Sequence, residues 1–265
     1  MTTPPFTRRS DVASISSGET RLQTGRQRTA LITGAARRIG RAIALDLAER
    51  GWNVAIHFRN SVDDAESLAA DVRTFGVRAE TFKADLSVAE QVDHLVAAVA
   101  AVMGAPCCLI NNASEFQLDT LQTLTRDTWH LHLDTNLKTP VFLAQGLAAH
   151  LPTGCEGNII NIIDQRVWNL KPDFFSYTIS KAGLWTATRM LAQALAPRIR
   201  VNAIGPGPVL RSIHQTEEEF AAEAASTLMG RGVSVAEIAD AVRFIMEAPA
   251  MTGQMIVLDG GQHLT

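Results

Sequence analysis

The sequence has 265 residues, of which 46% are hydrophobic and 19% are charged, and its net charge is −3. This length is enough for one large domain or two small ones with a buried core. The small net charge argues against a nucleic-acid partner, and no apolar run approaches the roughly 20 residues of a membrane-spanning helix. The three cysteines form no disulfide framework and the histidines show no metal-ligand spacing, so we expect a cytoplasmic protein without a metal.

Residues 1–28 are rich in serine, threonine and arginine and show no apolar periodicity. This composition is typical of a disordered tail, although a transit peptide has a similar one. No hydrophobic segment resembles that of a secretory signal. We predict a disordered tail over residues 1–28 and a single domain over residues 29–265.

From residue 29 onward, short apolar runs alternate with amphipathic stretches. The predicted strands are 30–33, 52–57, 78–84, 106–111, 158–163, 199–204 and 254–258. Between them the apolar residues recur at helical spacing, with one long helix expected over 125–151 and another from 177 to 196. This alternation predicts an α/β fold, a Rossmann-like doubly wound parallel sheet flanked by helices.

The first predicted strand is followed by a turn that carries Gly34 and Gly40 and then by a helix. Glycines in such a turn permit a tight bend and a close approach of the backbone to a ligand. The N-terminus of the helix presents free N–H groups and a positive dipole end to a pyrophosphate. The first strand, turn and helix therefore predict a dinucleotide site.

The end of the second predicted strand lacks the acidic residue that binds the ribose of NAD. The residues found there are His57, Phe58, Arg59, Asn60 and Ser61. The nearest carboxylate, Asp63, lies inside the next helix. Arg59 with its polar neighbours suits a 2′-phosphate through charge and hydrogen bonding, and Arg37 or Arg38 would add to it. The pattern predicts NADPH as cofactor rather than NADH.

Tyr177, the only tyrosine of the chain, is followed four residues later by Lys181. This spacing places the two side chains one turn apart on the same face of a helix. A nearby ammonium favours phenolate, so we expect Lys181 to lower the pKa of Tyr177 from its ordinary value of about 10. A phenol tuned in this way can exchange a proton with a carbonyl or an imine during reduction.

Further motifs accompany this pair in a fixed order along the chain. They are Thr33-Gly34 to Gly40, Ala84-Asp85-Leu86, Asn111-Asn112-Ala113, Asn136, Pro206-Gly207 and Leu258 to Gly261. Together they resemble the short-chain dehydrogenase/reductase family over residues 28–265. The resemblance implies the cofactor contacts Gly34, Arg37, Arg38, Ile39, Gly40, Asp85, Leu86, Asn112, Ala113, Tyr177, Lys181, Pro206 and Gly207. It also implies a water held by Asn136 in a proton relay, and a homotetramer packed through the two long helices.

Two residues depart from the usual pattern of that family. Arg38 stands where the glycine turn has its middle glycine, and Asp164 stands at the catalytic serine position, thirteen residues before Tyr177. Both features resemble the pteridine reductases and the similar dihydromonapterin reductases. In that subgroup a phenylalanine corresponding to Phe116 stacks the pterin against the nicotinamide. The substrate contacts implied are Arg38, Ser114, Phe116, Asp164 and Tyr177.

The resemblance predicts hydride transfer from NADPH to a C=N bond of a flat heterocycle. Tyr177, relayed through Lys181 and Asn136, would donate one proton. Asp164 would be a second donor in a protonated form that burial favours. The alternative for Asp164 is a structural carboxylate that pairs with Arg166 or caps the following loop.

Other interpretations of the site also follow from the sequence. Phe116 could be an ordinary packing residue, Glu115 is expected to be solvated, and Trp168 and Phe174 are expected to wall the substrate pocket. A reductase of small ketones or of 3-oxoacyl thioesters is the alternative enzyme. A catalytically silent NADPH-binding redox sensor is the alternative of another class.

Overall fold

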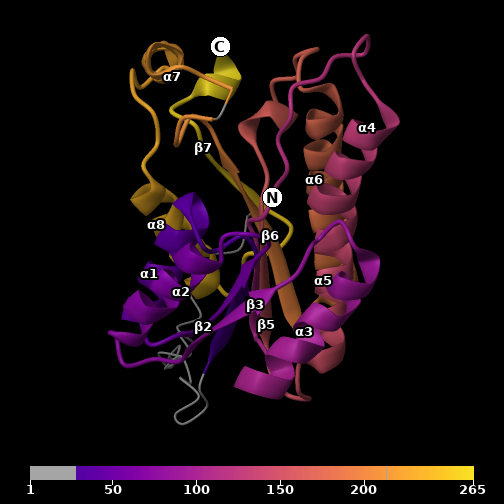
Figure 1. The fold of residues 1–265 in the computed structure, drawn as a ribbon, viewed down its shortest axis with the longest axis vertical. Coiled ribbons are helices and arrows are strands. Elements are labelled where there is room, and N and C mark those ends of the chain that lie inside the picture. Colours follow the sequence, from indigo (N-terminus) through magenta and orange to yellow (C-terminus); the bar gives the residue numbers. More distant parts are fainter. Residues whose placement is uncertain (1–27, 213) are drawn as a thin grey trace, which may run out of the picture.

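The computed structural model describes residues 28–212 and 214–265, and nearly all of the predicted N-terminal tail lies outside these residues. A parallel sheet of seven strands in the order β3-β2-β1-β4-β5-β6-β7 forms its centre (Figure 1). The strands are β1 (Thr29–Ile32), β2 (Asn53–Phe58), β3 (Ala79–Lys83), β4 (Cys108–Asn111), β5 (Gly157–Ile162), β6 (Ile199–Pro206) and β7 (Met255–Leu258). Each lies where the sequence predicts a strand, so the Rossmann-like prediction is confirmed.

Helices cover both faces of this sheet. They are α1 (Arg38–Glu49), α2 (Val62–Arg73), α3 (Ala89–Met103), α4 (Arg126–Leu133), α5 (Thr139–His150), α6 (Phe175–Leu195), α7 (Glu217–Ser226) and α8 (Val235–Glu247). One layer contains α1, α2 and α8, and the other contains α3, α4, α5 and α6 (Figure 1). Among the described residues, no helix is long and apolar enough to cross a bilayer, and no three potential metal-ligating side chains cluster together.

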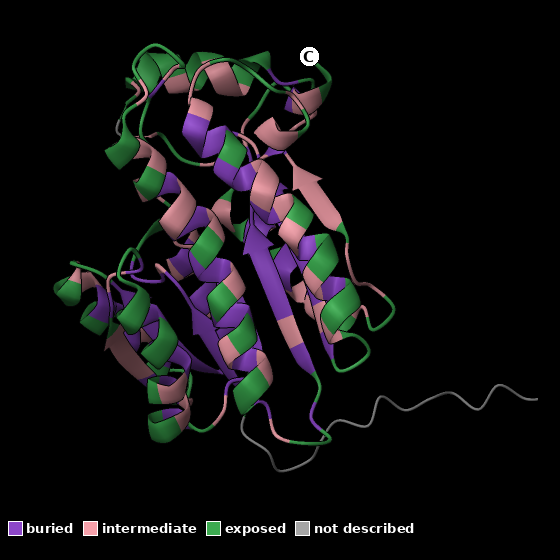
Figure 2. Ribbon diagram, turned by 90° about the vertical axis from the view of Figure 1, so that its right-hand side faces the viewer, coloured by how far each residue is buried: buried purple, intermediate pink, exposed green. Residues whose placement is uncertain are grey.

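The central strands β1, β4 and β5 are buried along nearly their whole length and are mostly apolar, because helices cover both of their faces. Leu31 and Ile32 of β1 point to opposite sides and belong to different core clusters, one beneath each helical layer. The central strands and the inner faces of the helices are buried, the edge strands β3 and β7 are partly exposed, and the outer faces of the helices are exposed (Figure 2).

The position of the functional site follows from the strand order. The chain runs outward from β1 to β3 on one side of the sheet and from β4 to β7 on the other. Adjacent β1 and β4 therefore leave a crevice at their carboxyl ends, where open α/β sheets bind their ligands. The loops after β1, β2, β4 and β5 all open toward this edge.

The long helix predicted over residues 125–151 is interrupted. Between α4 and α5 lies a π-helical segment, Asp134–Lys138, which contains the buried Asn136. The apolar pattern over residues 125–151 predicts helix throughout and does not show which turn contains the extra residue of a π-helix. Segments of this kind occur frequently at functional sites.

Candidate active site

The glycine turn after β1 packs directly on the end of β4. Gly34 has a φ of +61°, and a Cβ atom there would lie 3.0 Å from the Cα of Ala113. A Cβ on Gly40 would lie 2.6 Å from the carbonyl oxygen of Gly34 and 2.7 Å from Nδ2 of Asn112. The Asn112 amide donates to the carbonyls of Thr33 and Gly34 at 2.9 and 3.0 Å. Glycine is therefore required at both positions to keep the turn against β4.

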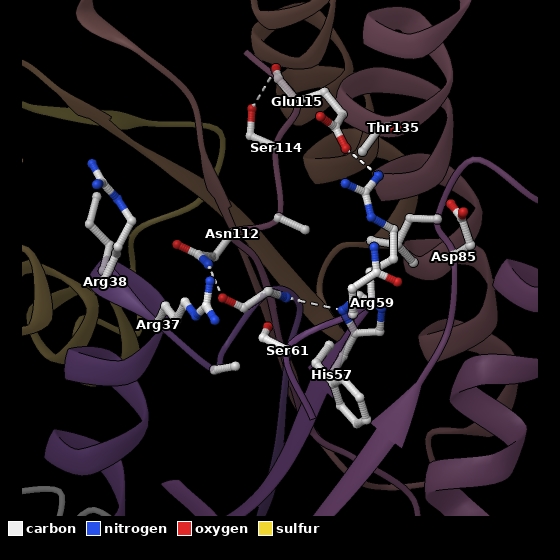
Figure 3. Close-up of a pocket in the computed structure, with 17 residues that line it drawn as sticks. Arg37, Arg38, His57, Arg59, Ser61, Asp85, Asn112, Ser114, Glu115 and Thr135 are labelled. Atoms are coloured by element: carbon white, nitrogen blue, oxygen red, sulfur yellow. Dashed lines mark hydrogen bonds and ion pairs between the residues drawn. The ribbon is translucent and has the colours of Figure 1, made fainter. Parts of the chain in front are cut away.

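The N-terminus of α1 is prepared for an anion. No side chain caps it, and its first turn contains no acidic residue, so its dipole is not neutralised by the chain. Arg37 forms an ion pair with Asp64 of α2. Arg38 has a φ of +55° and donates to the carbonyls of Leu210 and Arg211 at 3.0 and 2.9 Å. The Arg38 side chain thus points to the loop after β6 and away from Arg59 (Figure 3).

A cavity of about 540 Å³ lies beside this turn (Figure 3). Its lining includes Gly34, Ala36, Arg37, Arg38, Ile39, His57, Phe58, Arg59, Asn60, Ser61, Asp85, Leu86, Asn112 and Ala113. The residues predicted for the glycine turn and for the ends of β2 and β3 therefore converge on one site.

His57 connects the strand end to the glycine turn. Its Nδ1 accepts the N–H of Gly34 at 3.0 Å, and its Nε2 lies 3.1 Å from the carbonyl oxygen of Ala84. Burial lowers the pKa of His57 to about 4, so the ring is neutral with its proton on Nε2. Because protein groups occupy both nitrogens, His57 shapes the cavity and offers no free polar atom to a phosphate.

The charged residues Arg59 and Asp85 at the outer part of the cavity both have partners within the protein. Arg59 forms an ion pair with Glu115, which lies on the segment after β4 (Figure 3). The expectation that Glu115 is merely solvated is therefore wrong. The carboxylate of Asp85 accepts the N–H and the hydroxyl of Ser87 at 2.9 and 2.7 Å, which lowers the pKa of Asp85.

Tyr177 and Asp164 form a hydrogen-bonded pair. The phenol is 6% exposed and donates to Oδ2 of Asp164 at 2.8 Å. The other oxygen, Oδ1, accepts the N–H of Arg166 at 2.8 Å, and the Arg166 guanidinium pairs with Asp173. The carboxylate thus caps the following turn, as the structural alternative predicts, and also contacts the phenol, as the catalytic hypothesis requires.

The electrostatic relation of Tyr177 to Lys181 differs from the prediction. Burial, followed by the neighbouring Asp164 carboxylate, raises the pKa of Tyr177 well above its ordinary value. The Nζ of Lys181 lies 5.7 Å from the centre of the phenol ring and donates to the carbonyl of Ile162 at 2.9 Å. Burial lowers the pKa of Lys181 to about 8. The expected lowering of the tyrosine pKa is therefore wrong for this state, because a carboxylate and not the ammonium contacts the hydroxyl.

Burial also raises the pKa of Asp164. Burial disfavours the carboxylate and the phenolate alike, so the pair retains protons to a higher pH than either group would in water. A proton shared between two such groups is available to a substrate atom that replaces one of the partners.

The side-chain amide of Asn136 is fully engaged with protein. Its Oδ1 accepts the N–H of Glu115 at 2.8 Å and the hydroxyl of Ser114 at 3.2 Å. Its Nδ2 donates to the carbonyl of Glu115 at 2.9 Å and to Oγ of Ser180 at 3.1 Å. A water bound by Asn136 would have to use its main-chain carbonyl, and the amide itself fixes the segment after β4.

A second cavity, of about 610 Å³, lies over Tyr177 and Asp164. Phe116 stacks on Phe174 with ring centres 4.3 Å apart and meets Tyr177 edge-on at 4.7 Å. From the loop after β6, Nε2 of His214 lies 3.0 Å from the carbonyl oxygen of Phe116. Trp168, in contrast, does not line this cavity and packs against His263, so the expectation that it walls the pocket is wrong.

The two cavities adjoin. Both are lined by Arg38, Ile39, Asn112 and Ser114, and the second also contains Lys181, Pro206 and Gly207. Arg38 and Ser114 thus lie where a nucleotide in the first cavity would meet a substrate in the second.

The sequence analysis missed several residues at the site. Thr135 lines the first cavity, and Leu210, Ser212, His214 and Gln215 line the second. All but Thr135 belong to the irregular loop after β6. The family resemblance marks this loop, roughly residues 209–232, as the substrate loop that decides specificity, but no periodicity or motif shows which of its residues make contact. Thr135 precedes Asn136 in the π-helical segment, so only its neighbour in the sequence could have drawn attention to it.

Known proteins are similar to this chain in sequence and fold. The family described as enoyl-(acyl carrier protein) reductase matches residues 34–263. The crystal structure of FolM alternative dihydrofolate reductase 1 from Brucella suis, in complex with NADP, is 47% identical, with a TM-score of 0.87 over 90% of this chain and 96% of that one. A blue fluorescent protein from a metagenomic library, in complex with NADPH, is 28% identical, with a TM-score of 0.82 over 89% of this chain and 97% of its own.

A curated relative is named after a reaction other than dihydrofolate reduction. The 3-oxoacyl-[acyl-carrier-protein] reductase FabG of Staphylococcus aureus is 31% identical over 242 residues, which cover 89% of this chain and 98% of the relative. The match extends over nearly the whole of both proteins and includes the glycine turn and the Tyr177 helix. The chain therefore belongs to the short-chain dehydrogenase/reductase family of oxidoreductases.

Proposed function

We propose that this protein is an NADPH-dependent reductase that transfers hydride to a C=N bond of a pteridine. The observation that carries the proposal is the buried hydrogen bond of 2.8 Å between the Tyr177 hydroxyl and Asp164. Reduction of a C=N bond requires a proton at nitrogen, and this pair supplies one beside the flat aromatic wall of Phe116.

The first cavity fits a dinucleotide phosphate. Its glycine turn leaves no room for a Cβ atom at Gly40, and the N-terminus of α1 is uncapped. Arg59, Asn60 and Ser61 stand where a ribose 2′-phosphate would bind. NADP and NADPH occupy the related structures from Brucella suis and from the metagenomic library, which supports the same cofactor here. Bound NADPH would supply the hydride.

The remaining residues of the site bind and orient. In our proposal Lys181 binds the nicotinamide ribose, Asn112 lines the ribose side of the cofactor, and Pro206-Gly207 lies on the nicotinamide side. Phe116 offers a ring face to the heterocycle, although Phe174 covers one of its two faces. A flat substrate therefore stacks on the free face of Phe116 or displaces Phe174. The proton then passes from the Tyr177–Asp164 pair to the ring nitrogen.

The carboxylate distinguishes a pteridine from a ketone as substrate. A serine hydroxyl orients a carbonyl by donating a hydrogen bond, whereas a buried carboxylic acid can release a full proton to a basic nitrogen. Burial raises the pKa of Asp164, which favours the acid form. The relative from Brucella suis, named an alternative dihydrofolate reductase, supports this assignment. The Staphylococcus aureus relative keeps reduction of 3-oxoacyl thioesters as the second candidate.

The test is steady-state NADPH oxidation by the purified protein with dihydrobiopterin, dihydrofolate, small ketones and a 3-oxoacyl thioester. Turnover of a pterin with little turnover of the carbonyl compounds is expected. Turnover of carbonyl compounds alone would refute the pteridine assignment. NADPH binding without any turnover would favour a redox sensor.

A further inference from the structure

Three buried polar side chains behind the substrate cavity form a chain with no part in the proposed chemistry. They are Asp119, Ser176 and His132, with exposed fractions of 2%, 0% and 0%. The Ser176 hydroxyl bonds to Oδ2 of Asp119, and Oγ of Ser176 lies 2.6 Å from Nδ1 of His132. None of the three lines either cavity, so the chain acts on a ligand only through other residues.

The hydrogen bonds of this chain run in one direction. Nε2 of His132 accepts the main-chain N–H of Gln117 at 3.0 Å and therefore carries no proton. The proton of the neutral ring lies on Nδ1 and is donated to Ser176, whose own proton is donated to Asp119. Burial lowers the pKa of His132, in agreement with a neutral ring.

The chain links three separate parts of the fold. Gln117 and Asp119 lie on the segment after β4, His132 on α4 and Ser176 in the first turn of α6. The main-chain carbonyl of Asp119 accepts the N–H of Phe175 at 3.2 Å, and Oδ1 of its side chain accepts the N–H of Ser176 at 3.1 Å. These bonds cap α6, because Phe174 at its N-terminus provides no side-chain cap. The start of α6 is thereby fixed to the segment after β4.

The anchored residues flank the two rings that face the substrate. Phe116 directly precedes Gln117, and Tyr177 directly follows Ser176. The edge-on contact between the two rings, at 4.7 Å, therefore lies between two fixed points. We propose that the Asp119–Ser176–His132 chain is a positioning device that sets Phe116 relative to Tyr177 and so determines how well a flat ring fits beside the proton donor. This inference rests on the proposed pteridine reductase function.

Variants of His132 leave the cap of α6 in place, because His132 does not contribute to it. The His132 ring holds Phe116 through the N–H of Gln117 and also meets the Tyr177 ring edge-on at 6.0 Å, so these variants act on both rings that face the substrate. His132→Leu leaves the N–H of Gln117 without its acceptor and releases the segment that carries Phe116. When the whole free energy of that bond is transmitted to Phe116, the affinity for a stacked ring falls about fivefold to tenfold. We expect the KM for dihydropterin to rise by that factor, with kcat changed less than about threefold. NADPH affinity should stay within about twofold of wild type. His132→Gln keeps one hydrogen-bond acceptor and one donor. Its KM for dihydropterin should therefore lie closer to the wild-type value than that of His132→Leu.

Ser176→Ala and a control test the same chain from the other side. Ser176→Ala removes the hydroxyl between His132 and Asp119 and should raise the pterin KM in the same way. Thr188→Val removes another buried hydroxyl of α6, which bonds to Asn161 and Leu184 away from both cavities. This control should lower the melting temperature and leave the pterin KM unchanged.

Each outcome decides between the alternatives. A pterin KM that stays at the wild-type value in His132→Leu, or that changes equally in Thr188→Val, would overturn the positioning role. If Ser176→Ala does not fold, the pterin KM of His132→Leu compared with that of His132→Gln still tests the positioning role. Wild-type protein without pterin turnover would refute the proposed function itself, whereas wild-type turnover with unchanged variants would refute only this inference.

Discussion

The nucleotide side and the substrate side of the site are built in different ways. On the nucleotide side, contacts with main-chain atoms dominate, as in the close approach of Gly40 to the Gly34 carbonyl and the bond of the Asn112 amide to the same carbonyl. On the substrate side, Asp164, Phe116 and His214 come from the loops after three different strands and line one cavity. Single side-chain changes should therefore have larger functional effects on the substrate side than on the nucleotide side.

The largest expected effect is that of Tyr177→Phe. This variant removes the hydroxyl that bonds to Asp164 and with it a proton donor, so turnover should fall by about 10²–10⁴-fold. NADPH binding, measured by fluorescence titration, should remain within about twofold of wild type. Activity within a few-fold of wild type would show that the phenol is not the donor. Such activity would also contradict the expectation that side-chain changes have larger functional effects on the substrate side than on the nucleotide side.

The second prediction concerns the pH dependence of Asp164. Because burial raises its pKa, the acid form persists above the ordinary range of a carboxylic acid and disappears as the pH rises through that raised value. Pterin turnover should fall over that rise, and Asp164→Asn should lower kcat/KM by about 10²-fold and abolish this limb of the profile. Asp164→Ser should cost pterin reduction more than ketone reduction. Equal losses on both substrates would contradict the special role of the carboxylate.

The third prediction tests His57, which fixes the glycine turn from the nucleotide side. Its pKa is about 4 in the folded protein, below the ordinary 6.5 of an unfolded chain. The unfolded state therefore binds an extra proton between these values, and folding stability is lost as the pH falls from 6.5 toward 4. Between pH 7 and pH 5 this extra proton lowers the free energy of unfolding by about 2 kcal/mol.

Urea unfolding at several pH values measures this contribution. The loss of stability on acidification should be smaller in His57→Gln than in wild type. His150→Gln, a change at an exposed histidine on α5, should leave the wild-type slope unchanged. An identical slope in His57→Gln would mean that the buried ring is already charged or is exposed to solvent.

The smallest expected effect is that of Arg59→Gln on cofactor choice. The arginine is partly exposed and already paired with Glu115, so solvent and the carboxylate reduce its value for a 2′-phosphate. We expect the dissociation constant of NADPH to rise about tenfold, because one charge-assisted hydrogen bond is lost. The dissociation constant of NADH should change little. Arg41→Gln, which removes an arginine paired with Asp71 outside the cavity, serves as the control. A parallel loss for NADH would place Arg59 on another part of the cofactor.

Much of the nucleotide side could be predicted from the sequence because its chemistry is local. The glycine turn and the missing acid after β2 each lie within a few residues, and strand–helix alternation fixes the edge of the sheet at which they meet. The substrate side was predicted only in part. Asp164 and Phe116 followed from a family resemblance, while the contacts of His214 and the Arg38–Leu210 bond had no signal in the sequence.

The sequence by itself determined the doubly wound sheet, the family and the residues around the glycine turn, because periodicity and short motifs encode local structure. The tertiary structure alone decided which charge governs Tyr177, since a pKa depends on burial and on the nearest partner in space. It also decided the pairing of Arg59 with Glu115 and the chain from Asp119 to His132. These contacts join residues from separate elements, and no spacing along the chain specifies the distance between them.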